Sequence, residues 1–438
     1  MLYNSSVRTY VPVLELIKRV SYLRKLIFHI DANSAYLSWE ATYRLQQGEQ
    51  LDLREIPSVV GGDEESRHGI VLTKSIPAKK FNIKTGETLY NARSKCPTIV
   101  IVPPRYWLYM KCSLAMNQIF QEYTPQIQRF SIDESFLDFS NMEHLYPDYM
   151  KLAETIKERV KNELGFTVNI GISDRKLLAK VASDFKKPDR IHTLFPSEIK
   201  RKMWHLPVED LFMVGRATSL KLHNLNINTI GDLANYDLKI LKNKFKSHGQ
   251  LIWNYANGID SSKVRKSNYI QMKGIGNSTT IPFDVEDSDT AHRVLLSLCE
   301  TVSMRIRDSG NCCNVVSISI RGSDLISYSR QKKLGVCTDS TRKIYEVACY
   351  LFNDVWKGNP IRHLGVHITD FCGNDFYQCS ILDDFNYDKD RKLNKAVDEI
   401  RLKYGHKAIS RSCFLHSGLS SMCGGIGEED YPLMSSML

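Results

Sequence analysis

The sequence contains no uninterrupted apolar run of the roughly 18 residues that a membrane-spanning helix needs. Its first 25 residues lack the continuous apolar core and small-residue cleavage site of a secretory signal. Eleven cysteines, an odd number, lie between Cys96 and Cys423 without a CxxC pair, which disfavours a disulfide framework or a zinc site. These absences predict a cytoplasmic protein with reduced thiols and no membrane partner.

The composition allows several globular domains. A chain of 438 residues with 42% hydrophobic and 25% charged residues is long enough for two to four domains, each with its own core. The formal net charge of +10 suits a polyanionic partner such as nucleic acid, but it is also compatible with an ordinary basic protein.

Two adjacent acids, Asp133 and Glu134, stand inside the strand-forming run 131–138. Neighbouring carboxylates repel each other and lose hydration when sheltered, and a divalent cation would keep both ionised. A pair of acids alone is usually a solvated turn. Here, however, a third acid, Asp31, ends the short apolar strand 26–31, and a small-residue turn leads from it into a helix. We expect the two strand ends to face each other.

Lysines follow at two further places. Lys79 lies in a short helix that begins near Pro77, where free backbone N–H groups favour a phosphate, although a solvated basic face is the alternative. After the strand 166–172, a helix capped by Ser173 or Asp174 is predicted to end near Lys187, before a proline. The alternation of strands and helices over 26–195 predicts a mixed sheet flanked by helices.

Three motifs, FHIDANSAY, SIDESFLD and GISDRKLLAKVASDFKKP, occur in that order along the chain. Together they resemble the Y-family DNA polymerases, the translesion enzymes related to bacterial DNA polymerase IV, and the resemblance extends from Leu26 to about residue 410. It implies an α+β, right-hand polymerase with a palm (mixed sheet plus helices), small fingers, a helical thumb and a C-terminal βαββαβ little finger.

The expected domains, in chain order, are an N-terminal extension (1–25), palm (26–34 and 106–195), fingers (35–105), thumb with a helix-hairpin-helix (196–261), basic linker (262–273), little finger (274–374) and a tail (375–438).

By the resemblance, Asp31, Asp133 and Glu134 are the catalytic carboxylates that hold two Mg²⁺ ions, with the backbone carbonyl of Ala32 as a further metal ligand. Tyr36 occupies the steric-gate position, where an aromatic ring excludes a ribose 2′-hydroxyl. The implied activity is template-directed, low-fidelity DNA synthesis by two-metal-ion transfer to a primer 3′-hydroxyl, in translesion synthesis and damage tolerance.

Lys79 and Lys187 match positions that contact the incoming deoxynucleoside triphosphate in the family. This chain departs from the family at Ile76, where many relatives carry a tyrosine, and at Lys79, where an arginine is common. The loss of one phosphate hydrogen bond should cost about 1 kcal/mol of nucleotide binding.

Contacts with primer-template DNA are expected from the thumb and the little finger. Gly215 belongs to the hairpin at 210–218, which offers backbone N–H groups to a phosphate, although Met213 replaces the first glycine of the usual motif. The little-finger candidates, each alternatively a solvated side chain, are Arg321, Arg330, Lys332 and Lys333.

Residues 378–382 resemble the peptide by which such polymerases bind a sliding clamp, with Gln378, Ile381 and Leu382 as the contacts. Five-residue patterns of this kind are common by chance, and only the position just past the last domain supports it.

The alternative to a polymerase is a non-catalytic or accessory-dependent DNA-binding relative on the same scaffold. Retention of the three acids together with Lys187 argues against it. Nucleotide cyclases share a similar palm, but the resemblance of the thumb and the little finger disfavours that class.

Overall fold

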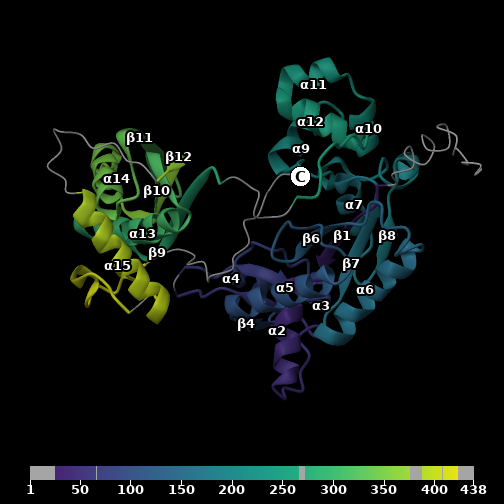
Figure 1. Ribbon diagram of the computed structural model, residues 1–438, viewed down its shortest axis with the longest axis horizontal. Helices are drawn as coiled ribbons and strands as arrows, with labels where there is room; N and C mark the ends of the chain where they lie inside the picture. The colour runs from purple at the N-terminus through teal and green to yellow at the C-terminus, as the bar shows by residue number, and fades with distance from the viewer. Residues whose placement is uncertain (1–24, 66, 266–271, 375–386, 407, 423–438) are drawn as a thin grey trace, which may run out of the picture.

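The computed structural model describes residues 25–65, 67–265, 272–374, 387–406 and 408–422. It confirms the predicted α+β architecture, and in Figure 1 the C-terminal elements β9 to α15 form a separate lobe beside the rest of the chain. None of the helices in these ranges combines the length and apolar character needed to cross a membrane. Residues 1–24 of the predicted N-terminal extension and the clamp peptide at 378–382 lie outside the described residues, as does half of the predicted linker, residues 266–271.

A five-stranded sheet forms the centre of the larger lobe, in the order β5-β6-β1-β7-β8. All neighbouring strands are antiparallel except β7 and β8, which are parallel. The strands are β1 (Ile27–Ala32), β5 (Ile127–Arg129), β6 (Glu134–Asp138), β7 (Val168–Ser173) and β8 (Ile191–Thr193).

The alternation of side chains along β1 separates a packing face from a chemical face. Phe28 and Ile30 enter the main core, which α2 (Ala35–Gln46), α5 (Tyr106–Gln121) and α6 (Tyr149–Leu164) cover. The intervening residues, Ile27, His29 and Asp31, point to the opposite face, where α7 (Lys176–Ser183) packs against β1 and β7. Figure 1 shows α7 on one side of this sheet and α5 and α6 on the other.

Gly171 allows α7 to lie directly on the sheet. A Cβ at this position would come within 1.9 Å of the Ala179 carbonyl oxygen and 2.4 Å of the Ser183 backbone nitrogen. The predicted cap of this helix was wrong, because Arg175 is the N-cap residue and Ser173 instead donates its hydroxyl to the Leu194 carbonyl at 2.6 Å. The helix is also shorter than predicted, so that Lys187 lies in the turn beyond it.

A small sheet and a helical unit complete this lobe. Ser75 caps α3 by accepting a hydrogen bond from the Ala78 backbone, as a serine before a helix start is expected to do. Met213 has a φ of 73°, a left-handed conformation that favours glycine and accounts for the glycine usual at this hairpin position. The elements are β2 (Ser58–Gly61), β3 (Val71–Lys74), α3 (Ile76–Lys79), α4 (Leu89–Lys95), β4 (Val100–Val102), η1 (Pro196–Glu198), α8 (Ile199–Lys202), η2 (Val208–Asp210), α9 (Arg216–His223), α10 (Ile230–Asn235), α11 (Leu238–Phe245) and α12 (Ser247–Ala256).

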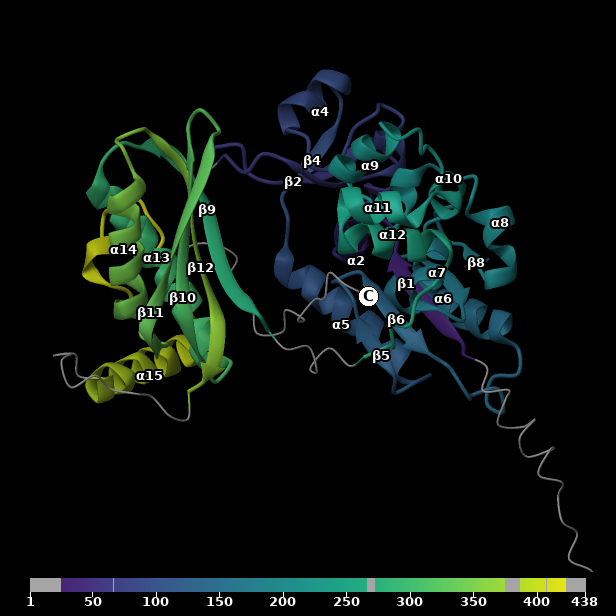
Figure 2. The same ribbon diagram turned by 90° about the horizontal axis from the view of Figure 1, so that it is seen from above.

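The C-terminal lobe has the predicted βαββαβ order, with an antiparallel sheet arranged β11-β10-β12-β9. Helices α13 and α14 cover one face of this sheet, and α15 crosses one end of the lobe (Figure 2). Its elements are β9 (Gly274–Val285), α13 (Ser288–Asp308), β10 (Asn311–Gly322), β11 (Ser327–Thr338), α14 (Thr341–Val355), β12 (Ile361–Gly373), α15 (Tyr387–Tyr404) and η4 (Ser412–Phe414).

The ordered C-terminal lobe continues past β12. Arg401 of α15 is 3% exposed and donates to Glu300 of α13 at 2.6 Å, while Arg411 donates to the other oxygen of Glu300 at 2.5 Å. Met422 is also buried. The described residues of 387–422 therefore belong to this lobe through ion pairs to the buried Glu300 as well as through apolar packing.

Candidate active site

A cleft of about 500 Å³ lies where the five-stranded sheet meets α2, α3 and the turn after α7. Every residue that the sequence placed at the catalytic, metal or nucleotide site lines this one cleft. They are Asp31, Ala32, Tyr36, Lys79, Asp133, Glu134 and Lys187.

Backbone pairing brings the three acids together. Asp31 is paired directly with Glu134 in the antiparallel ladder of β1 and β6, so these side chains leave the sheet on the same face. The next backbone amide, that of Ala32, donates to the Asp133 carbonyl at 3.0 Å. The two strand ends thus face each other as the sequence predicted.

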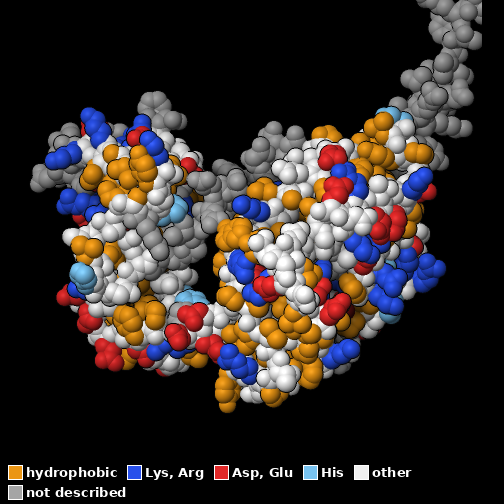
Figure 3. Space-filling model, turned by 90° about the horizontal axis from the view of Figure 1, so that it is seen from below, with side chains coloured by type: hydrophobic (Ala, Val, Ile, Leu, Met, Phe, Trp, Pro, Cys, Tyr) orange, Lys and Arg blue, Asp and Glu red, His pale blue; other side chains and the backbone are white. Residues whose placement is uncertain are grey.

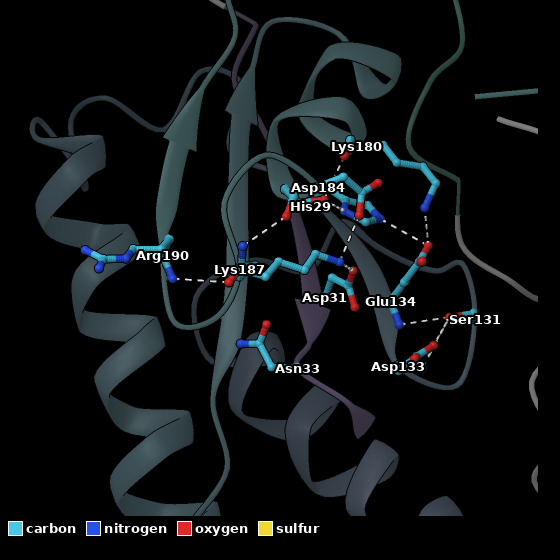
Figure 4. A network of polar contacts seen from close by, with 12 residues as sticks. His29, Asp31, Asn33, Ser131, Asp133, Glu134, Lys180, Asp184, Lys187 and Arg190 are labelled. Atoms are coloured by element: carbon cyan, nitrogen blue, oxygen red, sulfur yellow. Dashed lines mark hydrogen bonds and ion pairs between the residues drawn. The ribbon is translucent and has the colours of Figure 1, made fainter. Parts of the chain in front are cut away.

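Lys187 makes an ion pair with Asp31, as Figure 4 shows. Its ammonium also lies 2.8 Å from Asp184, the residue that follows α7. The lysine therefore joins a buried acid at the floor of the cleft to an exposed acid at its edge.

Glu134 is held by two side chains from the chemical face. Lys180 of α7 donates to its Oε2 at 2.5 Å, and His29 Nε2 lies 3.4 Å from the same oxygen. The other ring nitrogen of His29 is 2.8 Å from the Ser183 hydroxyl, which fixes the plane of the buried imidazole.

Asp133 has a different partner, because Ser131 donates its hydroxyl to Asp133 Oδ1 at 2.5 Å. The same serine oxygen accepts a hydrogen bond from the Glu134 backbone amide at 3.0 Å. Ser131 thereby shapes the tight turn that carries both acids (Figure 4).

Burial and charge act differently on the three acids. Burial raises the pKa of Asp31 to about 6 in spite of Lys187, and it also raises the pKa of Asp133. For Glu134, burial is outweighed by His29 and Lys180, which hold its pKa well below the usual range. Burial thus disfavours the charged form of Asp31 and of Asp133, and a bound cation would favour it.

The donor set fits a hard divalent cation, since it consists of carboxylate oxygens and a strand-end carbonyl. As the side chains stand, however, no three histidine, cysteine, aspartate or glutamate side chains converge on a metal-binding point within the described ranges. The contacts explain why, because Lys187 and Lys180 hold Asp31 and Glu134 while Asp133 turns to Ser131. Coordination of one cation by all three acids would therefore need these side chains to leave their present partners.

Tyr36 forms one wall of the cleft. Its ring stacks on Tyr109 of α5 with centroids 4.4 Å apart and planes 9° apart, and Tyr109 is fully buried. Lys79 is the exposed last residue of α3 on the opposite side. The cleft is thus bounded by an aromatic ring of fixed orientation and by an exposed lysine.

Sequence reasoning missed four residues of this polar network: His29, Ser131, Lys180 and Asp184. A signal existed for His29, which stands two positions before Asp31 and hence on the same face of the strand. For Lys180 the signal was weaker, because its position in a helix does not predict which strand its side chain contacts.

The predicted DNA-binding residues lie away from the cleft. Gly215 is the N-cap residue of α9 in the helical unit. A hollow of about 750 Å³ on the C-terminal sheet is lined mainly by polar and small residues, with Arg330 as its one lysine or arginine. Strand alternation places Arg321 and Lys333 on the open face of this sheet. By contrast, Arg330 and Lys332 point toward α14, where they contact Asp354 and Tyr350. In Figure 3 a deep hollow separates this lobe from the other on the face shown.

Comparison with known proteins agrees with this architecture. Family models match residues 30–184 (impB/mucB/samB family), 209–260 (DNA polymerase-iota, thumb domain) and 272–381 (impB/mucB/samB family C-terminal domain). A solved Y-family DNA polymerase chimera shares the fold with a TM-score of 0.69 and 21% identity, over 80% of this chain and 100% of that one.

Close relatives cover nearly the whole chain. DNA polymerase IV of Clostridium acetobutylicum is 49% identical over 393 residues, which are 90% of this chain and 99% of that protein. DNA polymerase IV of Acetivibrio thermocellus is 38% identical over 397 residues, 90% of this chain and 98% of that protein.

These relatives, together with the acid-bearing sheet, the helical unit and the C-terminal lobe, identify the chain as a DNA-directed DNA polymerase. Specifically, the chain belongs to the Y family of DNA polymerases, among the bacterial DNA polymerase IV proteins.

Proposed function

We propose that the cleft joins a deoxynucleotide to a primer 3′-hydroxyl opposite a template base, with Asp31, Asp133 and Glu134 as the ligands of two Mg²⁺ ions. The observation that carries this proposal is the direct pairing of Asp31 with Glu134 in the β1–β6 ladder, with Asp133 one residue away. Acids placed together by backbone register are difficult to explain as solvated surface charges, because Asp31 is only 7% exposed.

Bound Mg²⁺ would lower the pKa of the primer hydroxyl and neutralise charge on the triphosphate. The carbonyl of Ala32, at the end of β1, would complete the oxygen ligands. The protein's own contribution is to hold three carboxylates in a sheltered cleft. Before a cation binds, Lys187 neutralises the charge of Asp31 and Lys180 neutralises the charge of Glu134.

Tyr36 and the two cleft lysines would select and hold the nucleotide. The stack of Tyr36 on the buried Tyr109 gives its ring a fixed place, which a steric test of the 2′-position requires. Lys79 is exposed at the end of α3, and Lys187 can exchange Asp31 for a phosphate once that acid is bound elsewhere. Both cations would stabilise the charge that develops during phosphoryl transfer.

Primer-template DNA would lie between the thumb and the little finger. Gly215 would offer a backbone N–H group to a phosphate, while Arg321 and Lys333 would contact DNA from the open face of the sheet. Arg330 and Lys332 are candidates for contacts at its edge strand, β11.

The cellular role that we propose is translesion synthesis during tolerance of DNA damage in the bacterial cytoplasm. Binding of residues 378–382 to a sliding clamp would recruit the enzyme to stalled primers. The names of the relatives support the polymerase assignment, and the clamp and the repair role are inferences from it.

Primer extension tests the proposal. The native chain, Glu134→Ala and Glu163→Ala are compared on an undamaged primer-template with Mg²⁺ and four deoxynucleotides. Glu163 is an exposed α6 residue that does not line the cleft, so Glu163→Ala should extend normally. Glu134→Ala should lose extension but retain DNA binding. If the native chain binds DNA without extending it, the accessory-dependent alternative is favoured instead.

A further inference from the structure

Lys180 is buried beside the cleft, between Glu134 and two aromatic rings. Its ammonium is 2.5 Å from Glu134 Oε2, 5.0 Å from the centre of the Phe130 ring and 5.7 Å from that of Phe212. The residue is only 8% exposed. Phe130 precedes the acid-bearing turn of the palm, whereas Phe212 belongs to the thumb, one residue before Met213.

The two lysines that neutralise the acids differ in freedom. Lys187 lies in a turn, its side chain is 32% exposed, and it divides its charge between Asp31 and Asp184. Lys180 projects from α7, which Gly171 holds against the sheet, and aromatic rings lie beside its ammonium. Lys187 can therefore move to a phosphate, while Lys180 makes an ion pair with Glu134 alone within the described ranges.

The contacts of Glu134 are one-sided. Both Lys180 and His29 reach Oε2 of this carboxylate, and no other side chain of the described residues holds Oε1. A carboxylate held through one oxygen by a fixed cation keeps its other oxygen in a constant direction.

We propose that Lys180 is a positioning residue that orients Glu134 for metal binding and links this orientation to the thumb through Phe212. The proposal rests on the proposed function, in which Glu134 is a metal ligand. A fixed positive charge near the metal site must weaken cation affinity by Coulomb repulsion. Its benefit is orientation, on which the rate of reaction depends steeply. Removal of the charge should therefore move metal affinity and turnover in opposite directions.

The test compares the native chain with Lys180→Met, which keeps the length of the side chain and removes its charge. Mn²⁺ binding is followed by the electron paramagnetic resonance signal of the free ion, with a primer-template whose primer ends in a dideoxynucleotide. We expect Lys180→Met to bind Mn²⁺ at least about threefold more tightly. Its kcat on an extendable primer should fall about tenfold or more, with a smaller change in the KM for nucleotide. Lys180→Arg should recover part of the kcat.

Lys176→Met is the matched control. Lys176 lies one turn earlier on α7, is fully buried and stands 4.8 Å from the Phe136 ring, but it donates to Gln128 instead of an acid of the cleft. Circular dichroism melting of each variant identifies any loss of folding. Lys176→Met should leave Mn²⁺ affinity unchanged.

Three results would overturn the proposal. Weaker or unchanged Mn²⁺ binding by folded Lys180→Met would refute the claim that the charge of Lys180 lowers the affinity of the site for cations. Tighter binding with undiminished kcat would make Lys180 a competitor of the metal and not a positioning residue. An equal gain in affinity in Lys176→Met would show a general charge effect. Failure of the proposed function has a separate signature, namely native-level extension by Glu134→Ala.

Discussion

Replacement of Gly171 by alanine tests whether the contact between β7 and α7 builds the site. The new Cβ would meet backbone atoms, the Ala179 carbonyl oxygen at 1.9 Å and the Ser183 nitrogen at 2.4 Å. Neither can move without displacing the helix, so the cost should lie near the upper end of the 1–3 kcal/mol typical of overpacking. Alanine also lowers the conformational entropy of the unfolded chain, which raises the free energy of unfolding by about 0.4–1 kcal/mol. We expect a net loss of about 2 kcal/mol.

Urea denaturation followed by circular dichroism measures this loss, and Gly215→Ala is the control. Gly215 has a φ of −84°, and no atom lies within 4 Å of the place that an alanine Cβ would occupy, so alanine fits there without strain. Gly171→Ala should also reduce primer extension at low urea, because a displaced α7 moves Lys180 away from Glu134. Equal stability of the two variants would refute the reasoning that α7 packs against β7 so closely at Gly171 that a side chain there does not fit.

Tyr36→Ala should admit ribonucleotides in primer extension, since the ring stacked on Tyr109 would no longer occupy the wall of the cleft; unchanged sugar discrimination would assign Tyr36 to packing alone. Glu300→Gln should destabilise the little finger by about 3 kcal/mol at pH 7, because it leaves Arg401 buried without its anion. Burial opposes ionisation of Glu300, but Arg411 and Arg401 hold its pKa below the usual value. The stabilisation is therefore present at neutral pH and lost as the pH falls below about 4, so the gap between variant and native chain in urea titrations should close there. A gap that is constant with pH would contradict this. Deletion of 378–382 should reduce clamp-stimulated synthesis and spare unstimulated synthesis; intact stimulation would dismiss the clamp peptide.

Much of the architecture was accessible from local patterns. The apolar strand that ends at Asp31 and the mixed sheet flanked by helices over 26–195 follow from periodicity and turn residues, which act over a few positions. The βαββαβ order of the little finger was implied by the resemblance. The resemblance added the roles of Asp31, Asp133 and Glu134, and the structure places these three acids at one cleft. Their catalytic roles stay predictions that the variants above will test.

The extent of α7 was less predictable. Ser173 has the chemistry of a cap, but the strand β7 extends through it and its hydroxyl is used by Leu194. Competition of this kind between a strand end and a helix start depends on the neighbouring strand, which periodicity does not identify.

The sequence by itself determined which residues are acidic and which strands carry them, because these properties depend on composition and short-range spacing; the order of the domains was implied by the resemblance. Only the tertiary structure decided that Lys180 and His29 hold one oxygen of Glu134, and that Arg321 and Arg330 lie on opposite sides of the little-finger sheet. These relations arise from strand register and from the close seating of a helix on a sheet. A shift of one residue in register would reverse the face of every side chain. The alternation along one strand shows which of its residues share a face, but it does not show which residues of a distant strand or helix lie opposite them.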